Sequence, residues 1–253
     1  MGEHTGEQGI GADLPGIYLR WLSLEEHSLD AERLLPILST EERERYASTE
    51  AAPMAERFVV GRVLLRMLAA ELTGSRPSAV RVVACCAYCG GSHGRPRLEG
   101  PDSALALLSV SIAHCAGAVV VAVSSAGAVG VDVEPAAGPR GRGERRASGP
   151  FATGGVRRAD PVLHGTRIGA ALKANGRGLD LDPQRVHVHE SRFAAEARID
   201  GVRFRLAEPT LDPALRVSVA LGPIAGTGTG PIIGWRREHG DSLTDSLASA
   251  GRR

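Results

Sequence analysis

The chain has 253 residues, of which 43% are hydrophobic and 23% are charged, a composition typical of a globular protein with its own core. A formal net charge of +1 gives no general attraction to nucleic acid or to an anionic membrane, so we expect neither partner. Without a secretory signal or a bilayer-spanning apolar run, the protein is expected to be cytoplasmic, and its four cysteines to be thiols.

The first elements are predicted from short local signals. Residues 1–15 are polar and rich in glycine, which indicates a flexible leader. The apolar run Ile17–Leu22 predicts a strand. Ser39 is followed three residues later by Glu42, and this spacing is a capping box that begins a short helix.

Glu56–Leu72 is the clearest predicted helix. Its apolar side chains recur at helical spacing, and Gly74 follows as a stop signal. Arg62 and Arg66 share the face opposite to the apolar one.

Short runs rich in β-branched residues predict several strands, at 79–84, 107–113, 118–124 and 129–134. The dipeptide Ala126-Gly127 separates the last two strands and predicts a hairpin turn. After these strands the character changes, because residues 136–165 are rich in arginine and glycine and lack apolar periodicity. We expect an irregular loop there.

Order resumes with a short helix at Ala170–Asn175, which Gly176 ends. Further strands are expected at 186–189, 202–206 and 215–221. Residues 223–253 are glycine-rich and then polar, and we expect them to form a flexible tail.

Two carboxylates end one of the predicted strands. In Gly130–Glu134 (GVDVE), Asp132 and Glu134 are two residues apart and therefore point to the same side. Carboxylate oxygens suit magnesium, which typically takes one or two protein carboxylates and completes its shell with water and phosphate oxygens. The pattern predicts half of a magnesium site that serves a pyrophosphate substrate, although a solvated strand end is the simpler alternative.

The order of the motifs resembles the 4′-phosphopantetheinyl transferase superfamily, of the type that activates peptide and polyketide synthetases. That family has a G-[IV]-D-[IV]-E strand, preceded by N-x-S-H and followed by W-x-x-K-E-A-x-x-K and G-x-G-L. The matching segments here are Leu38–Arg45, Glu56–Arg66, His93–Pro96, Ser109–Gly117, Gly130–Glu134 and Ala170–Leu179.

The resemblance implies an α+β fold of two similar halves, here 16–115 and 116–222, related by a pseudo-twofold axis. Coenzyme A would bind between them. The reaction would move its phosphopantetheine arm to a serine of an acyl or peptidyl carrier protein, with Mg²⁺ on the pyrophosphate, and a monomer would suffice.

The resemblance also assigns residues. The catalytic positions correspond to Asp132, Glu134 and Lys173, and the first two are the metal ligands. The positions that bind coenzyme A correspond to Arg57, Arg95, His114 and Lys173. In the family, the arginine and the histidine contact the 3′-phosphate and the lysine reaches the pyrophosphate.

The third motif departs from the family. Gly165, Ile168 and Gly169 replace its tryptophan, first lysine and glutamate, and Ala113 replaces the serine of N-x-S-H. The missing glutamate is the third carboxylate of the site and a candidate general base. Two explanations are open: a diverged member with impaired activity, or a segment before Ala170 translated out of frame. A tryptophan followed by Lys-Glu-Ala in another reading frame would support the second.

Two other functions are open alternatives. The first is an inactive module on the same fold that binds coenzyme A or the carrier protein. The second is an arginine-rich nucleic-acid binder with a zinc knuckle, because Cys86 and Cys89 have the C-x-x-C spacing. No second C-x-x-C follows, so a turn that contains thiols is the simpler interpretation of this pair.

Overall fold

The computed structural model describes residues 16–25, 30–86, 89–91, 94–136, 160–191, 194–223, 232–241 and 243–244. The fold is mixed α+β, as expected. Within these ranges, no helix is both long and apolar enough to cross a membrane.

The bounds of the elements are as follows. The strands are β1 Gly16–Ser23, β2 Arg81–Val83, β3 Arg97–Glu99, β4 Ser109–His114, β5 Ala118–Ser124, β6 Ala128–Pro135, β7 Val186–Glu190, β8 Ala195–Ile199, β9 Val202–Ala207, β10 Leu215–Gly222 and β11 Ile232–Glu238. The α-helices are α1 Thr40–Ser48, α2 Ala52–Thr73 and α3 Pro161–Asn175. Short 3₁₀ helices are Ala31–Ile37, Pro77–Ala79, Ser103–Leu107, Gly178–Asp180 and Pro183–Arg185.

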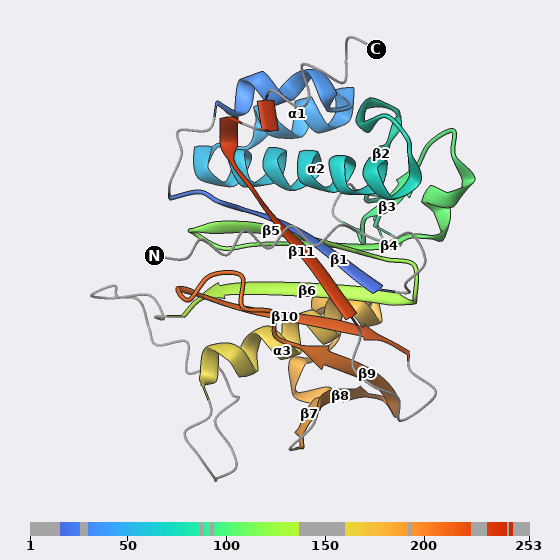
Figure 1. The fold of residues 1–253 in the computed structure, drawn as a ribbon, viewed down its shortest axis with the longest axis vertical. Helices are drawn as coiled ribbons and strands as arrows, with labels where there is room; N and C mark the ends of the chain where they lie inside the picture. The colour runs from blue at the N-terminus through green and yellow to red at the C-terminus, as the bar shows by residue number, and fades with distance from the viewer. Residues whose placement is uncertain are drawn as a thin grey trace, which may run out of the picture.

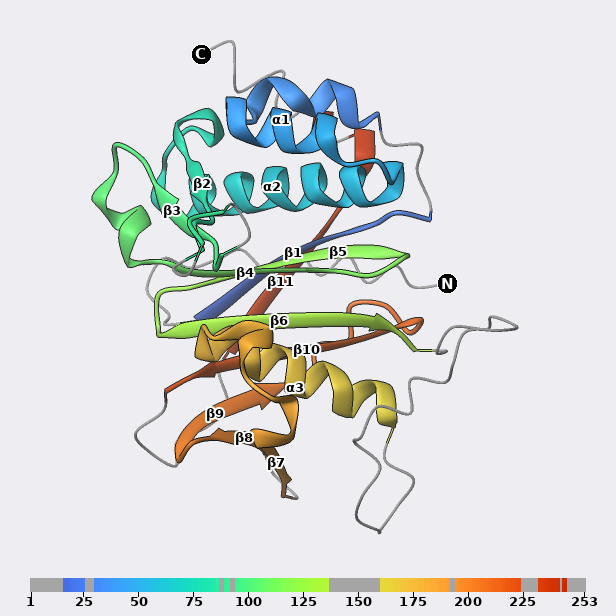
Figure 2. The same ribbon diagram turned by 180° about the vertical axis from the view of Figure 1, so that it is seen from behind.

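Two sheets stack between helices. The first has the order β11-β1-β5-β4 and the second β6-β10-β9-β8-β7, while β2 and β3 form a small separate ribbon. Helix α2 covers the outer face of the first sheet and α3 covers the outer face of the second (Figures 1 and 2). The layers are therefore helix, sheet, sheet, helix, with a separate apolar cluster in each of the three spaces between them.

Strand β5 shows why the sheets stack. All of its residues are buried, which suits a strand covered on both faces. Val119, Val121 and Val123 pack toward α2. Val120 and Ala122 pack toward the second sheet. Because successive side chains of a strand point to opposite faces, β5 packs against α2 on one face and against the second sheet on the other.

The connection between β5 and β6 differs from the expected hairpin. A turn does occur at 125–127, but β5 pairs with β1 and β4, whereas β6 pairs with β10 in the other sheet. The hairpin prediction was wrong because the chain crosses from one sheet to the other at this turn. Strand β6 still reaches β4, because Ser109 Oγ and Ser111 Oγ accept hydrogen bonds from the backbone N–H groups of Val129 (2.9 Å) and Val131 (3.1 Å).

Helix α3 begins earlier than expected. It starts at Pro161, so 161–165 are helical, while 137–159 lie outside the described residues. Asp160 provides the physical reason, because its carboxylate accepts hydrogen bonds from the N–H groups of Val162 and Leu163 at 3.0 and 3.1 Å. Capping by Asp160 and the fixed φ of Pro161 favour a helix start despite the glycines that follow.

The segment expected to be a tail also differs. Ile232–Glu238 forms β11, which pairs in parallel with β1. Strands β3 and β8 were likewise not expected. They are short and partly exposed, and β11 follows a glycine-rich stretch, so their periodicity gives little signal.

Gly130 allows α3 to rest directly on β6. A Cβ atom at this position would lie 2.0 Å from the carbonyl oxygen of Ala170 and 2.5 Å from the backbone nitrogen of Ala174. These are backbone atoms of α3, so a side chain could be accommodated only by moving the helix. The glycine therefore fixes the distance between the helix that carries Lys173 and the strand that carries Asp132.

Candidate functional site

A cleft of about 950 Å³ lies between α1 and α2, the segment before β3, strand β4 and the C-terminal end of α3. Its cationic lining residues are Arg45, Arg57, Arg62, Arg95, Arg97, Lys173 and Arg177. Among the described residues, the one carboxylate in the lining is that of Asp180. The cleft is thus electropositive although the net charge of the chain is only +1, which favours an anionic ligand.

The four residues expected to bind coenzyme A all line this cleft. Arg57 comes from α2, Arg95 from the turn before β3, His114 from the end of β4 and Lys173 from the last turn of α3. Four separate segments thus converge on one space. His93, which belongs to the same motif as Arg95, lies outside the described residues.

Arg57 and Arg95 have cationic groups that no carboxylate neutralises in the described part of the chain. Arg57 Nη1 contacts Met54 Sδ at 3.5 Å and its buried Nε has no hydrogen-bond partner in the described structure. Arg95 Nη2 donates to Ser109 Oγ at 3.0 Å, and burial lowers the pKa of Arg95. Within the described ranges, neither guanidinium forms an ion pair with a carboxylate, so both can bind an anion.

Arg62 and Arg66, on the face of α2 opposite to the predicted apolar one, both have buried side chains. Glu42 of the capping box binds both, with Oε2 2.5 Å from Arg66 Nη2 and Oε1 3.5 Å from Arg62 Nε. Burial lowers the pKa of Arg62 to about 10, although Glu42 opposes this. Arg45 and Arg62 stack on the ring of Phe58, at 4.6 and 5.2 Å from its centroid.

Lys173 lines the cleft and also contacts Asp132, one member of the carboxylate pair. Lys173 Nζ donates to Asp132 Oδ1 at 2.7 Å and to the carbonyl oxygen of Val131 at 3.0 Å. Glu134 is exposed on the same strand. Partial desolvation and the neighbouring Asp132 carboxylate raise its pKa, while Lys173 opposes the rise.

Gly169, the position at which the resemblance predicts a third carboxylate, lies directly beside this pair. A Cβ atom on Gly169 would be 2.2 Å from Asp132 Oδ2, so the side chain of Asp132 occupies the space that the family's glutamate would need. In the described part of the chain, no group of three or more histidine, cysteine or acidic side chains could hold a metal. The two carboxylates fit Mg²⁺ only if phosphate and water supply its other ligands.

His114 gives the cleft a testable pH dependence. Partial desolvation is the largest effect that lowers the pKa of His114. The charges of Arg57 and Lys173 lower it further, while the Asp132 carboxylate raises it. A bound dianion would raise the pKa of His114, so anion affinity should increase as pH falls from the pKa of the bound state to that of the free state.

Sulfate is a suitable probe for this effect, because it remains a dianion between pH 5 and 8. Its affinity should increase by up to about tenfold for each unit by which binding raises the pKa of His114. Titration calorimetry of the wild type and of His114→Gln would measure the effect. An equal pH dependence in both proteins would exclude His114 as the titrating group.

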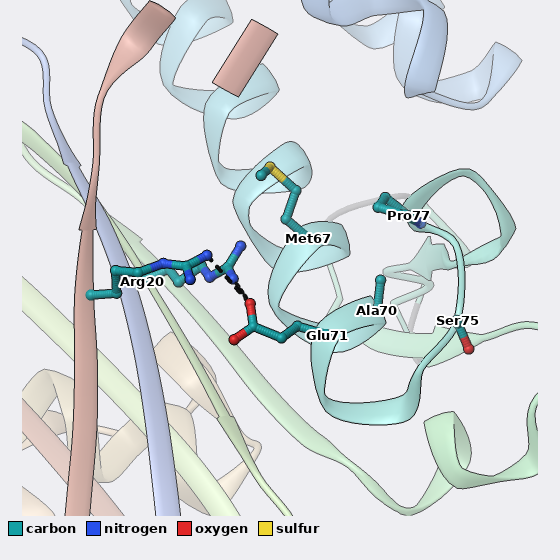
Figure 3. A pocket seen from close by; sticks show the side chains of 7 residues that line it. Arg20, Met67, Ala70, Glu71, Ser75 and Pro77 are labelled. Carbon is teal, nitrogen blue, oxygen red and sulfur yellow. Dashed lines mark hydrogen bonds and ion pairs between the residues drawn. The ribbon is translucent and has the colours of Figure 1, made fainter. Parts of the chain in front are cut away.

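A second, smaller hollow contrasts with the cleft. It has a volume of about 280 Å³ and is lined by Arg20, Glu71 and Arg236, among others (Figure 3). Glu71 pairs with both Arg20 and Arg236, and Glu238 pairs with both as well. Burial lowers the pKa of Arg20 to about 10. These ion pairs link α2, β1 and β11. Because carboxylates already neutralise the cations of this hollow, little charge is left for a ligand.

Among the described residues, the cysteines near the cleft belong to no group of three or more histidine, cysteine or acidic side chains that could hold a metal. Cys85, Cys86 and Cys89 line the cleft. Gly91 N–H donates to Cys89 Sγ at 3.4 Å, and Cys85 Sγ contacts the carbonyl oxygen of Gly90 at 3.5 Å. These contacts describe a turn stabilised by backbone groups and thiols.

Comparison with known proteins adds no assignment. No model of a protein family matches this sequence, and no curated protein is significantly similar to it.

Proposed function

We propose that the protein transfers the 4′-phosphopantetheine arm of coenzyme A to a serine of an acyl or peptidyl carrier protein, with a slow chemical step. The observation that supports this most is the cationic cleft, in which Arg57, Arg95, His114 and Lys173 converge from separate segments. Coenzyme A carries a 3′-phosphate and a pyrophosphate, and guanidinium and ammonium groups are the usual protein ligands of phosphate oxygens.

The connectivity of the sheets supports two related halves. In the first, β1 pairs with β5 and β5 with β4, while α2 lies between β1 and β4 in the chain. In the second, β6 pairs with β10 and β10 with β9, while α3 lies between β6 and β9. This repeated order is compatible with a pseudo-twofold relation, and the cleft receives residues from both halves.

In the proposed reaction, the serine oxygen of the carrier attacks the β-phosphorus of coenzyme A. A P–O bond forms, the bond to 3′,5′-ADP breaks, and the serine proton is released. Arg95 and Lys173 would hold the pyrophosphate oxygens, and Arg57 and His114 the 3′-phosphate. Most of the catalysis would be positioning and charge stabilisation. Mg²⁺ held by Asp132 and Glu134 would neutralise charge on the pyrophosphate.

The chemical step should be slow because Gly169 supplies no carboxylate to accept the serine proton. The same observation favours a second candidate function, a coenzyme A or carrier-protein binding module without turnover. Incubation with a fluorescent coenzyme A, Mg²⁺ and a panel of apo carrier proteins separates the two. Slow, Mg²⁺-dependent labelling that a Ser→Ala carrier abolishes would support transfer, whereas coenzyme A affinity without labelling would support the binding module.

Gly169→Glu is expected to raise the rate of transfer by about tenfold or more, and by up to the roughly 10²–10⁴-fold that a well-placed general base contributes. Asp132 would have to rotate away, because its carboxylate fills the space beside residue 169. Ile168 should stay unchanged, since it is buried in the core and a lysine there would be costly.

Gly165→Glu is the matched control for this rate measurement. Position 165 lies one turn earlier in α3, and no atom lies within 4 Å of a Cβ placed there. This variant should leave the rate unchanged. Equal rates for Gly169→Glu and the wild type would contradict the assignment of residue 169 as the third carboxylate position.

A further inference from the structure

Arg177 lines the same cleft as Lys173 and is not among the residues proposed above to bind coenzyme A. It follows Gly176, whose left-handed backbone (φ 86°) ends α3. Its Nε donates to Asn175 Oδ1 at 2.7 Å and its Nη2 donates to Asp200 Oδ2 at 2.5 Å. Two contacts on different nitrogens fix the plane of the guanidinium at the edge of the cleft.

Asp200 holds Arg177 without neutralising this edge of the molecule. Its other oxygen, Oδ1, accepts a hydrogen bond from Arg185 Nη2 at 2.5 Å, so two guanidinium groups share one carboxylate. The hydrogen bond from Arg177 lowers the pKa of Asp200, which is therefore ionised at neutral pH. One net positive charge remains, and Arg177 is the member of the pair that lines the cleft.

Gly176 also brings Arg95 to the same place. A Cβ on Gly176 would lie 2.9 Å from Arg95 Nη1, so the absence of a side chain there makes room for the guanidinium. Arg95, Lys173 and Arg177 thus all line the cleft near the C-terminal end of α3.

We infer that Arg177 is a further ligand of the pyrophosphate group, bound together with Arg95 and Lys173. The inference rests on the proposed function of the cleft and adds a residue to its binding site. A guanidinium in a fixed plane can present two N–H donors to one phosphate, which an ammonium cannot do. The hydrogen bonds of Arg177 to described residues use Nε and Nη2, so Nη1 is available for this contact.

Arg177→Gln and Arg185→Gln provide a matched test of the inference. Each removes one cation that pairs with Asp200, and each pair is exposed, so neither change should unfold the protein. Calorimetric titration with inorganic pyrophosphate at low salt should show affinity about tenfold weaker for Arg177→Gln. Arg185→Gln should resemble the wild type, and Arg177→Lys should fall between them.

Equal losses in Arg177→Gln and Arg185→Gln would overturn the inference, because the effect would then be one of net charge. A wild type that does not bind pyrophosphate would overturn both the inference and the proposed role of the cleft. If Arg177 is needed for pyrophosphate binding but no carrier protein is ever labelled, the inference stands and the proposed transfer alone fails.

Discussion

Gly130→Ala should destabilise the protein by about 3 kcal/mol, at the upper end of the cost of overpacking a core. The added Cβ would overlap the carbonyl oxygen of Ala170 and the backbone nitrogen of Ala174. Neither atom can move without displacing α3. Urea unfolding should show a lower midpoint with an unchanged slope, because the surface exposed on unfolding stays the same.

Gly165→Ala is the control for that measurement. It also replaces a glycine by alanine, but in α3 and at a position where the added Cβ has no atom within 4 Å. Alanine is the better helix former by about 0.8–1.0 kcal/mol, so this variant should be more stable than the wild type. Loss of stability in both variants would show that the tight contact at Gly130 is not the cause.

The double variant Arg57→Ala/Arg95→Ala should bind coenzyme A at least about a hundredfold more weakly than the wild type, since each charged hydrogen bond contributes about 1.5–3 kcal/mol. These two guanidiniums have no carboxylate partner in the described structure, so their removal leaves no buried acid unpaired. Titration calorimetry of both proteins would measure the ratio.

Arg76→Ala is the appropriate control for the loss of charge. Arg76 is exposed, precedes β2 and does not line the cleft. Its removal should change the affinity for coenzyme A by no more than about twofold, the size expected of a distant screened charge. A double variant that binds as tightly as the wild type would place the ligand elsewhere.

Local signals in the sequence predicted several elements correctly. The capping box at Ser39 and Glu42 begins α1, and both of its hydrogen bonds are present. Gly74 ends α2 with a left-handed backbone. Such signals depend on contacts between residues a few positions apart, so they do not require knowledge of the tertiary structure.

Features that depend on tertiary structure were not predictable in this way. The turn at 125–127 has the composition of a hairpin, yet the pairing of β6 with β10 decides its path. Arg62 and Arg66 follow the pattern of a polar helix face, but Glu42 pairs with them inside the protein.

The candidate site shows the same division. The order of motifs selected Arg57, Arg95, His114 and Lys173, and the structure brings them to one cleft. Arg177 was not selected, although its position between two glycines, Gly176 and Gly178, was a signal of an unusual backbone path. In the structure both glycines have positive φ. Its approach to the cleft depends on Asp200, which is distant in sequence.

The most direct test of the account is a crystal structure of the protein with coenzyme A and Mg²⁺. We predict the 3′-phosphate beside Arg57 and His114, and the pyrophosphate beside Arg95, Lys173 and the Asp132 carboxylate. Coenzyme A bound outside the cleft, or a cleft that stays empty at coenzyme A concentrations that saturate the protein, would contradict the account.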